Sequence, residues 1–344
     1  MTEQPLPAEQ ADLLARSNIR SLADAAEMAQ MLTAHCRAAV QGRDEVIDLI
    51  LVALFGDGHV LLEDYPGSGK TTLAKALGES IISGHEEIQG LTSFRRVQFT
   101  PDLLPSDITG VTIFDPDSNS FEFQRGPVFA HVVLADEINR TSPKVQAALL
   151  EAMGEKQVTV DNTTYRLDDL FFVLATQNPL DLVGTYPLPL AQLDRFLFKI
   201  RMEHLERAAE LEVLSNWSRY KTPLQLPRVS RDDIVAARIL VHREVQIAQP
   251  VREALVDLAR AVRADRRVLQ GVSTRALVLA MPAMQARAML RGRDYVSSED
   301  LQALLVPLMA HRIEVVPGVE DPTAVITEAA AEAMETLTRS TMRR

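Results

Sequence analysis

Residues 61–72 read Leu61-Leu62-Glu63-Asp64-Tyr65-Pro66-Gly67-Ser68-Gly69-Lys70-Thr71-Thr72. An apolar stretch enters a turn rich in Pro and Gly, and a Lys-Thr pair opens the segment that we expect to be a helix. The backbone N–H groups of such a loop close around phosphate, and the positive end of the helix adds to the attraction. In this pattern Lys70 reaches the β- and γ-phosphates of a nucleotide, and Thr71 binds Mg²⁺.

One residue departs from the full phosphate-loop pattern. The pattern has Gly five positions before Gly69, and Asp64 stands there. Asp tolerates turn and left-handed backbone conformations better than most residues, so the loop can still form. The other interpretation is a glycine-rich turn with a chance Gly-Lys-Thr, and the rest of the chain decides between the two.

The composition is that of a globular protein with more than one domain. The chain has 344 residues, 47% of them hydrophobic and 24% charged, and a formal net charge of −11. Nucleic-acid-binding domains are usually basic, so the charge disfavours a general role in binding DNA or RNA. The single cysteine, Cys36, excludes an internal disulfide. The most apolar early run, residues 47–62, is interrupted by charged residues, and the N-terminus lacks the regions of a signal peptide. We therefore expect a cytoplasmic protein with no membrane span.

Short apolar segments alternate with helical patterns after residue 60. The predicted strands are Val60–Leu62, Arg96–Phe99, Val132–Ala135, Phe171–Ala175 and Leu197–Ile200. The first, third and fourth are apolar throughout, as strands buried on both faces are. Helices between the strands predict an α/β fold with a doubly wound parallel five-stranded sheet. The clearest helix begins at Pro143, and we expect Gly154 to end it.

Two insertions break this alternation. In each one, two short alternating segments flank a polar turn, which predicts a β-hairpin. The first hairpin joins residues 111–114 to 121–124, and the second joins residues 158–160 to 165–167.

The pattern also divides the chain into domains. Residues 1–35 are predicted to form an N-terminal helical lead, and residues 36–205 an α/β nucleotide-binding domain. Residues 206–230 form a linker marked by prolines, residues 231–312 an α-helical second domain, and residues 313–344 a partly helical C-terminal tail.

Polar residues follow two of the predicted strands. Asp136 and Glu137 end the third strand, at the sheet edge where the phosphate loop is expected. Asp136 can hold Mg²⁺ through water, and Glu137 can orient and deprotonate an attacking water. The alternative is a strand that ends in a polar turn, and the phosphate loop upstream favours the catalytic interpretation. Asn178, after the fourth strand, can hold the same water or the γ-phosphate, or can simply form an Asn-Pro turn.

Two arginines are weaker candidates. Arg195, at the end of a helix before a strand, could reach the nucleotide of a neighbouring subunit as an arginine finger. Arg275 begins a helix in the second domain, where a cation could contact the γ-phosphate and couple nucleotide state to domain closure. On pattern alone, surface ion pairs are the favoured interpretation of both.

Taken together, these residues resemble the MoxR family of AAA+ ATPases, from about Val40 to Arg312. The most specific strings are Gln98-Phe99-Thr100-Pro101-Asp102-Leu103-Leu104-Pro105-Ser106-Asp107, Leu134-Ala135-Asp136-Glu137-Ile138-Asn139-Arg140, Ala175-Thr176-Gln177-Asn178-Pro179, Gly184-Thr185-Tyr186-Pro187-Leu188-Pro189 and Leu193-Asp194-Arg195-Phe196. The resemblance implies an AAA+ P-loop NTPase core with two β-hairpin insertions, followed by an all-α helical lid domain.

The resemblance also implies roles for single residues. The residues expected to bind ATP are Val40, Gly42, Gly67, Ser68, Gly69, Lys70, Thr71, Thr72 and Asp136, with Thr71 and Asp136 serving Mg²⁺. Glu137 would complete the Walker B pair and Asn178 would be the first sensor. Arg195 would be the finger that acts in trans, and Arg275 the second sensor. Arg140 is a further candidate for a subunit interface.

The function implied is Mg²⁺-dependent ATP hydrolysis by a ring, expected to be a hexamer, that remodels, matures or loads a metal or cofactor into a partner protein. Proteins with a von Willebrand factor A domain are the partner class that the resemblance implies, and the hairpins would face the centre of the ring. Two alternatives stay open: a DNA-acting AAA+ motor, and a nucleotide-dependent scaffold with little turnover.

Overall fold

A computed structural model describes residues 7–64, 68–83, 91–179, 184–215, 227–319 and 321–341. Its first half contains α1 (Ala8–Arg16), α2 (Leu22–Ala39), α3 (Asp44–Phe55), β1 (Val60–Asp64), α4 (Lys70–Glu79), β2 (Ile81–Ile82), β3 (Thr92–Gln98), α5 (Pro105–Thr109), β4 (Gly110–Asp115), β5 (Ser120–Arg125), β6 (Ala130–Asp136), η1 (Ile138–Arg140), α6 (Pro143–Glu155), β7 (Gln157–Val160), β8 (Thr163–Arg166) and β9 (Phe172–Gln177).

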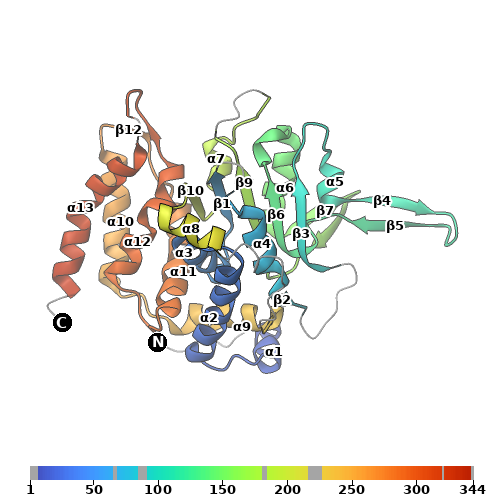
Figure 1. Cartoon of the computed structure of the whole chain (residues 1–344), viewed down its shortest axis with the longest axis horizontal. Helices are drawn as coiled ribbons and strands as arrows, with labels where there is room; N and C mark the ends of the chain where they lie inside the picture. The colour runs from blue at the N-terminus through green and yellow to red at the C-terminus, as the bar shows by residue number, and fades with distance from the viewer. Residues whose placement is uncertain are drawn as a thin grey trace.

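The second half is mostly helical (Figure 1). It contains α7 (Leu190–Leu193), β10 (Phe198–Met202), α8 (Arg207–Ser215), β11 (Val229–Ser230), α9 (Arg231–Glu244), α10 (Gln249–Ala264), β12 (Val268–Gln270), α11 (Thr274–Leu290), α12 (Ser298–Met309), η3 (Ala310–Arg312), β13 (Glu314–Val315) and α13 (Pro322–Thr341). The division of the chain into domains stays a prediction, and α13 of the predicted tail packs on α10 and α12.

The centre of the molecule is a parallel five-stranded sheet with the strand order β10-β1-β9-β6-β3. All five predicted strands lie in it, so the predicted fold class is confirmed. β3 begins at Thr92, four positions before the predicted start. It lies at the edge of the sheet, and Phe94 is the single apolar residue among its first four positions, so its first half carries no apolar run.

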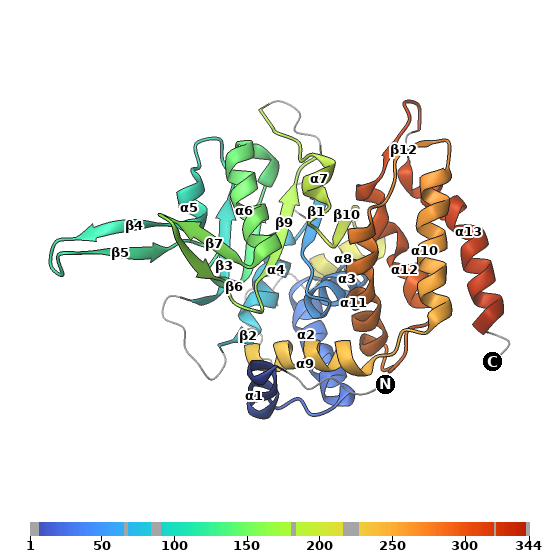
Figure 2. The ribbon, with the colours of Figure 1, turned by 180° about the vertical axis from the view of Figure 1, so that it is seen from behind.

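Alternate residues of each central strand enter two separate hydrophobic cores. Leu62 and Leu134 pack with α2, α3, α4 and the C-terminal helices, while Leu61 and Val133 pack with α6 on the opposite face. Figure 2 shows α6 on the face opposite to that seen in Figure 1. The sheet is therefore covered on both sides, which explains its apolar strands.

One buried arginine binds the C-terminal helices to the segment before β10. The side chain of Arg312, in η3, is 1% exposed. It pairs with the Asp194 carboxylate at 2.7 Å and also donates to the carbonyl oxygens of Phe196 and Leu197, at 2.5 and 3.0 Å. Ser273, just before α11, donates to the same Asp194 carboxylate at 3.3 Å. The C-terminal helices therefore hold the segment that follows α7 at several points.

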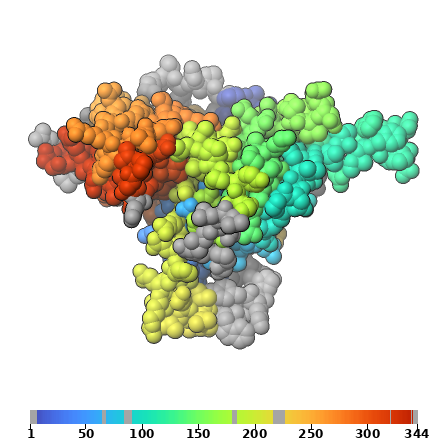
Figure 3. Space-filling view, turned by 90° about the horizontal axis from the view of Figure 1, so that it is seen from above, coloured from blue at the N-terminus to red at the C-terminus, as the bar shows by residue number. Residues whose placement is uncertain are grey.

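Both predicted hairpins are present, as β4–β5 and β7–β8. The β4–β5 hairpin projects away from the rest of the molecule in all three overall views (Figures 1–3). Its exposed Phe114 and Phe121 form an edge-to-face pair with ring centroids 5.3 Å apart. Nearer the body, Phe123 stacks on Tyr165 of the second hairpin with centroids 4.0 Å apart. This aromatic contact links the two insertions.

One predicted helix end is wrong. Helix α6 continues through Gly154 to Glu155, and Lys156 ends it with a left-handed φ of 47°. Because Gly154 has no side chain, Arg195 can approach the helix closely: a Cβ atom on Gly154 would lie 2.2 Å from Nη1 of Arg195. Glycine at this position makes room for an arginine and does not turn the chain.

Candidate ATP site at the carboxyl edge of the sheet

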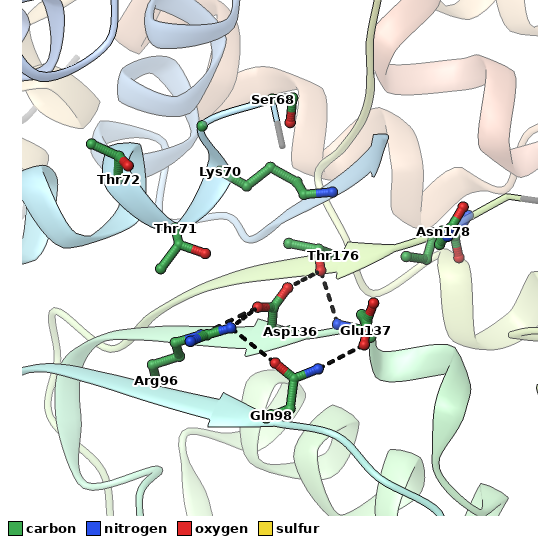
Figure 4. A pocket seen from close by; sticks show the side chains of 12 residues that line it. Ser68, Lys70, Thr71, Thr72, Arg96, Gln98, Asp136, Glu137, Thr176 and Asn178 are labelled. Carbon is green, nitrogen blue, oxygen red and sulfur yellow. Dashed lines mark hydrogen bonds and ion pairs between the residues drawn. The ribbon is translucent and has the colours of Figure 1, made fainter. Parts of the chain in front are cut away.

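A cavity of about 400 Å³ lies between the start of α4 and the carboxyl ends of β3, β6 and β9 (Figure 4). The described residues that line it are Ser68, Gly69, Lys70, Thr71, Thr72, Arg96, Gln98, Asp136, Glu137, Thr176, Gln177 and Asn178. Motifs that lie more than 60 residues apart in the chain therefore share one pocket, because parallel strands end at the same edge of a sheet.

The N-terminus of α4 forms the side of the cavity where phosphate is expected. Gly69 has a φ of 94°, in the left-handed region where glycine is favoured, and it leads directly into the helix at Lys70. The Ser68 hydroxyl is buried and has no hydrogen-bond partner among the described residues. A buried polar atom of this kind at a helix N-terminus fits an anion that accepts its hydrogen bond. The donor set therefore fits a phosphate group. Gly67 lies outside the described residues.

The opposite side carries the two carboxylates. Asp136 is buried, and its Oδ1 accepts a hydrogen bond from the Thr176 hydroxyl at 2.7 Å. The Thr176 Oγ1 in turn accepts the backbone N–H of Glu137 at 2.8 Å. Glu137 has a left-handed φ of 58°, which turns the chain sharply after β6. Together these bonds fix the backbone at the point where the second carboxylate leaves the strand.

Two side chains of β3 hold these carboxylates from the edge of the sheet. Arg96 pairs with Asp136 at 2.7 Å, and Gln98 donates to Glu137 Oε2 at 2.7 Å. Arg140 approaches the same Glu137 oxygen at 3.4 Å, so within the chain it faces this carboxylate. No sequence motif predicted a role for Arg96, Gln98 or Thr176. Only the strand pairing, which sets Gln98 opposite Asp136, reveals them.

The donor set also fits Mg²⁺. Thr71 supplies a hydroxyl and Asp136 a carboxylate, and hard oxygen ligands of this kind are those that Mg²⁺ prefers. No group of three or more His, Cys, Asp or Glu side chains that could hold a metal ion occurs in the described ranges, here or elsewhere. A cation here would therefore depend on phosphate oxygens for the rest of its ligands.

Two further residues expected to bind ATP are Val40 and Gly42. The side chain of Val40 packs on the phosphate loop, where a Cβ atom at Gly69 would come within 3.4 Å of it. Gly42 has a left-handed φ of 68° and lies under α8, since a Cβ atom there would approach Ala209 to 2.8 Å. Neither residue lines the cavity in the described part of the chain.

The structure brings Asn178 to the pocket, but it places both candidate arginines outside its described lining. Arg195 donates from Nη1 to the Leu150 carbonyl of α6 at 2.9 Å. Arg275 is exposed at the start of α11, close enough to Arg312 for its charge to contribute to the lowered pKa of Arg312, of which burial is the main cause. In a single subunit, Arg195 is directed at a helix end and not at the phosphate loop.

Comparisons with known proteins match this geometry. The family model described as "ATPase family associated with various cellular activities (AAA)" matches residues 59–198, and the AAA lid domain model matches residues 260–333. YeaC of Bacillus subtilis is 46% identical over 288 residues, 82% of this chain and 86% of that protein. Chaperone MoxR1 of Mycobacterium tuberculosis is 37% identical over 287 residues, 80% of this chain and 72% of that protein.

Two further relatives extend the comparison. MoxR of Methylorubrum extorquens is 32% identical over 306 residues, 82% of this chain and 86% of that protein. A crystal structure from Cytophaga hutchinsonii superposes with a TM-score of 0.77 at 35% identity, over 92% of this chain and 95% of that one. The similarity therefore includes both the sheet and the helices that follow it.

Proposed function

Because the chain belongs to the MoxR family of AAA+ ATPases, we propose that it hydrolyses ATP with Mg²⁺ in a ring of subunits and uses that cycle to remodel a partner protein. The observation that carries the proposal is the single cavity that joins Lys70 and Thr71 at the start of α4 to Asp136 and Glu137 at the end of β6.

Each residue has one task in the proposed reaction. Lys70 binds the β- and γ-phosphates, while Thr71 and Asp136 hold the cation. Mg²⁺ neutralises charge on the phosphates when it is bound. Glu137 orients a water molecule and takes its proton, and Asn178 fixes the same water from the next strand. Arg195 of a neighbouring subunit stabilises the charge that spreads over the transferred phosphoryl group, and Arg275 responds to hydrolysis through α11.

The partner is proposed more narrowly as a protein with a von Willebrand factor A domain, with metal or cofactor loading as the outcome. The chaperone name of one relative supports a protein client. The resemblance alone supports this partner class and a hexameric ring. ATP-dependent co-elution of the Glu137→Gln variant with a purified protein of this class from the same organism would test it. Equal co-elution without nucleotide would reject it.

Lys70→Ala tests the site assignment directly. We expect ATP binding and hydrolysis to fall to background, because the variant loses the side chain that reaches the β- and γ-phosphates. Fluorescent nucleotide titration and phosphate release measure the two effects. Lys75→Ala is the matched control, since Lys75 lies on the same helix with its side chain 59% exposed. Full activity in Lys70→Ala would reject the proposed function.

A further inference from the structure

The Asp136 carboxylate, which is expected to bind Mg²⁺, already forms an ion pair with the guanidinium of Arg96. Arg96 of β3 directs its Nε and Nη2 at the same oxygen, Asp136 Oδ2, at 3.2 and 2.7 Å. Its Nη2 also donates to Gln98 Oε1 at 2.9 Å. Figure 4 shows this guanidinium beside the Asp136 carboxylate, and Arg96 is one of the residues that line the pocket. Arg96 therefore already binds one of the two carboxylate oxygens that Asp136 could offer to a metal ion.

The pairing of β3 with β6 places Arg96 next to Asp136. Arg96 and Gln98 are two positions apart and share one face of β3, and the register pairs Gln98 with Asp136 on β6. The other oxygen of Asp136 is held by the Thr176 hydroxyl. Both oxygens of Asp136 thus have protein donors, and a cation that uses Oδ2 must compete with Arg96.

We propose that Arg96 is the resident counter-cation of the metal site, which a divalent cation displaces from Asp136 when it binds together with ATP. The proposal rests on the proposed function, because it takes the Thr71–Asp136 pair as the metal site. Its consequence is that the protein alone binds divalent cations weakly, while the nucleotide complex binds them well.

The physical reason is competition between like charges for one oxygen. A divalent cation at Asp136 would lie beside the guanidinium, so Arg96 must move away first. The apparent affinity for the cation is then the intrinsic affinity multiplied by the fraction of molecules in which Arg96 has moved. ATP changes this balance because its phosphates add negative charge and further ligands for the metal. The Arg96 side chain is 47% exposed, so the guanidinium can move into solvent at small cost.

Titration of the nucleotide-free full-length protein with Mn²⁺, followed by electron paramagnetic resonance, tests the proposal without relying on turnover. Arg96→Ala should bind Mn²⁺ about two- to fivefold more tightly than the wild type, the range expected for loss of a partly exposed ion pair. Arg96→Lys should stay close to the wild type, because the positive charge is kept. The gain should vanish in the double variant Arg96→Ala, Asp136→Asn.

Arg95→Ala is the matched control, because Arg95 is exposed on the opposite face of the same strand. Equal Mn²⁺ affinity of the Arg96→Ala and Arg95→Ala variants would overturn the proposal. So would a large loss of ATP binding by Arg96→Ala in EDTA, which would show that Arg96 binds phosphate. A wild type that binds no ATP would instead reject the proposed function, so the two failures are distinguishable.

Discussion

Glu137 combines an unusual backbone conformation with the position expected of the water-activating group. Its left-handed φ of 58° is sparsely populated by residues other than glycine, and such strain persists where the surrounding structure enforces it. Two hydrogen bonds hold Glu137 in this conformation: its N–H donates to Thr176, and Gln98 donates to its carboxylate.

Glu137→Gln should keep the shape of this turn and remove the base. We expect ATP to bind with wild-type affinity while hydrolysis falls by roughly 10²-fold or more, since general bases contribute about 10²–10⁴-fold. Nucleotide titration and single-turnover hydrolysis measure the two effects. Rapid turnover by this variant would remove Glu137 as the catalytic base.

Gly154 leaves space for the guanidinium of Arg195, the proposed arginine finger. In Gly154→Ala the new methyl group must displace that guanidinium from its bond to Leu150. We expect turnover to fall by roughly tenfold, because small misplacements of a charged catalytic group are costly. ATP affinity should not change, and thermal stability should change little, since the preference of about 1 kcal/mol for Ala over Gly within helices offsets the lost hydrogen bond to Leu150. Unchanged turnover would show that the position of the Arg195 guanidinium beside Gly154 does not matter for hydrolysis.

The sequence predicted those site residues that are neighbours in the chain. Lys70 with Thr71, and Asp136 with Glu137, carry their signal in consecutive letters, so a motif is enough. Arg96 could not be predicted in this way, because its partner lies 40 residues later and meets it only through the pairing of β3 with β6. Roles that arise from strand register need the structure.

At the scale of elements, His59 joins three segments of the core. Its Nδ1 accepts the N–H of Val173 in β9, and its Nε2 lies 3.2 Å from the Met153 carbonyl of α6. Burial is the main cause that lowers the pKa of His59 to about 4. Protonation at Nδ1 would also break the bond from Val173, so the folded protein keeps this ring neutral.

This shift predicts how stability depends on pH. The unfolded chain takes up a proton on His59 below its ordinary pKa of about 6.5 and the folded chain does not, so the free energy of unfolding decreases as the pH falls from there towards 4. The full effect is about 3 kcal/mol. Urea unfolding at a series of pH values measures it. His59→Gln should reduce the slope by about one proton, while His311, whose pKa burial also lowers, keeps contributing.

The main elements could be predicted because their patterns are local. Apolar runs gave the central strands, and polar turns between alternating segments gave both hairpins. The pairs β2–β11 and β12–β13 could not be predicted, since strands of two or three residues carry no readable period. The end of α6 was wrong because a glycine that makes room for Arg195 looks the same in sequence as one that ends a helix.

In the whole molecule, the residue proposed as the arginine finger lies away from the pocket of its own subunit. Arg195 faces the end of α6 and is outside the described pocket lining, so the proposed chemistry needs a second copy of the chain. No helix in the described ranges is long and apolar enough to cross a membrane.

Mixed assemblies test the shared site. Arg195→Ala and Lys70→Ala should each be inactive alone, and their mixture should recover part of the ATPase activity, because a Lys70→Ala subunit can lend its Arg195 to an intact pocket. A mixture of Lys70→Ala with Glu137→Gln is the control. Both changes damage the pocket itself, so no complete site can form. If neither mixture recovers ATPase activity, Arg195 does not act on the nucleotide of a neighbouring subunit.

The projecting β4–β5 hairpin has a mechanical consequence. Gly110 and Gly126 cross at its base so closely that a Cβ atom on Gly126 would lie 2.5 Å from the Gly110 nitrogen, and the Phe123–Tyr165 stack braces it against the second hairpin. Each strand has six residues, so the tip stands about 20 Å from that base. If the sheet domain rotates by about 10°, a rigid arm of this length moves Phe121 by roughly 3–4 Å. This displacement is about the length of one residue in an extended chain.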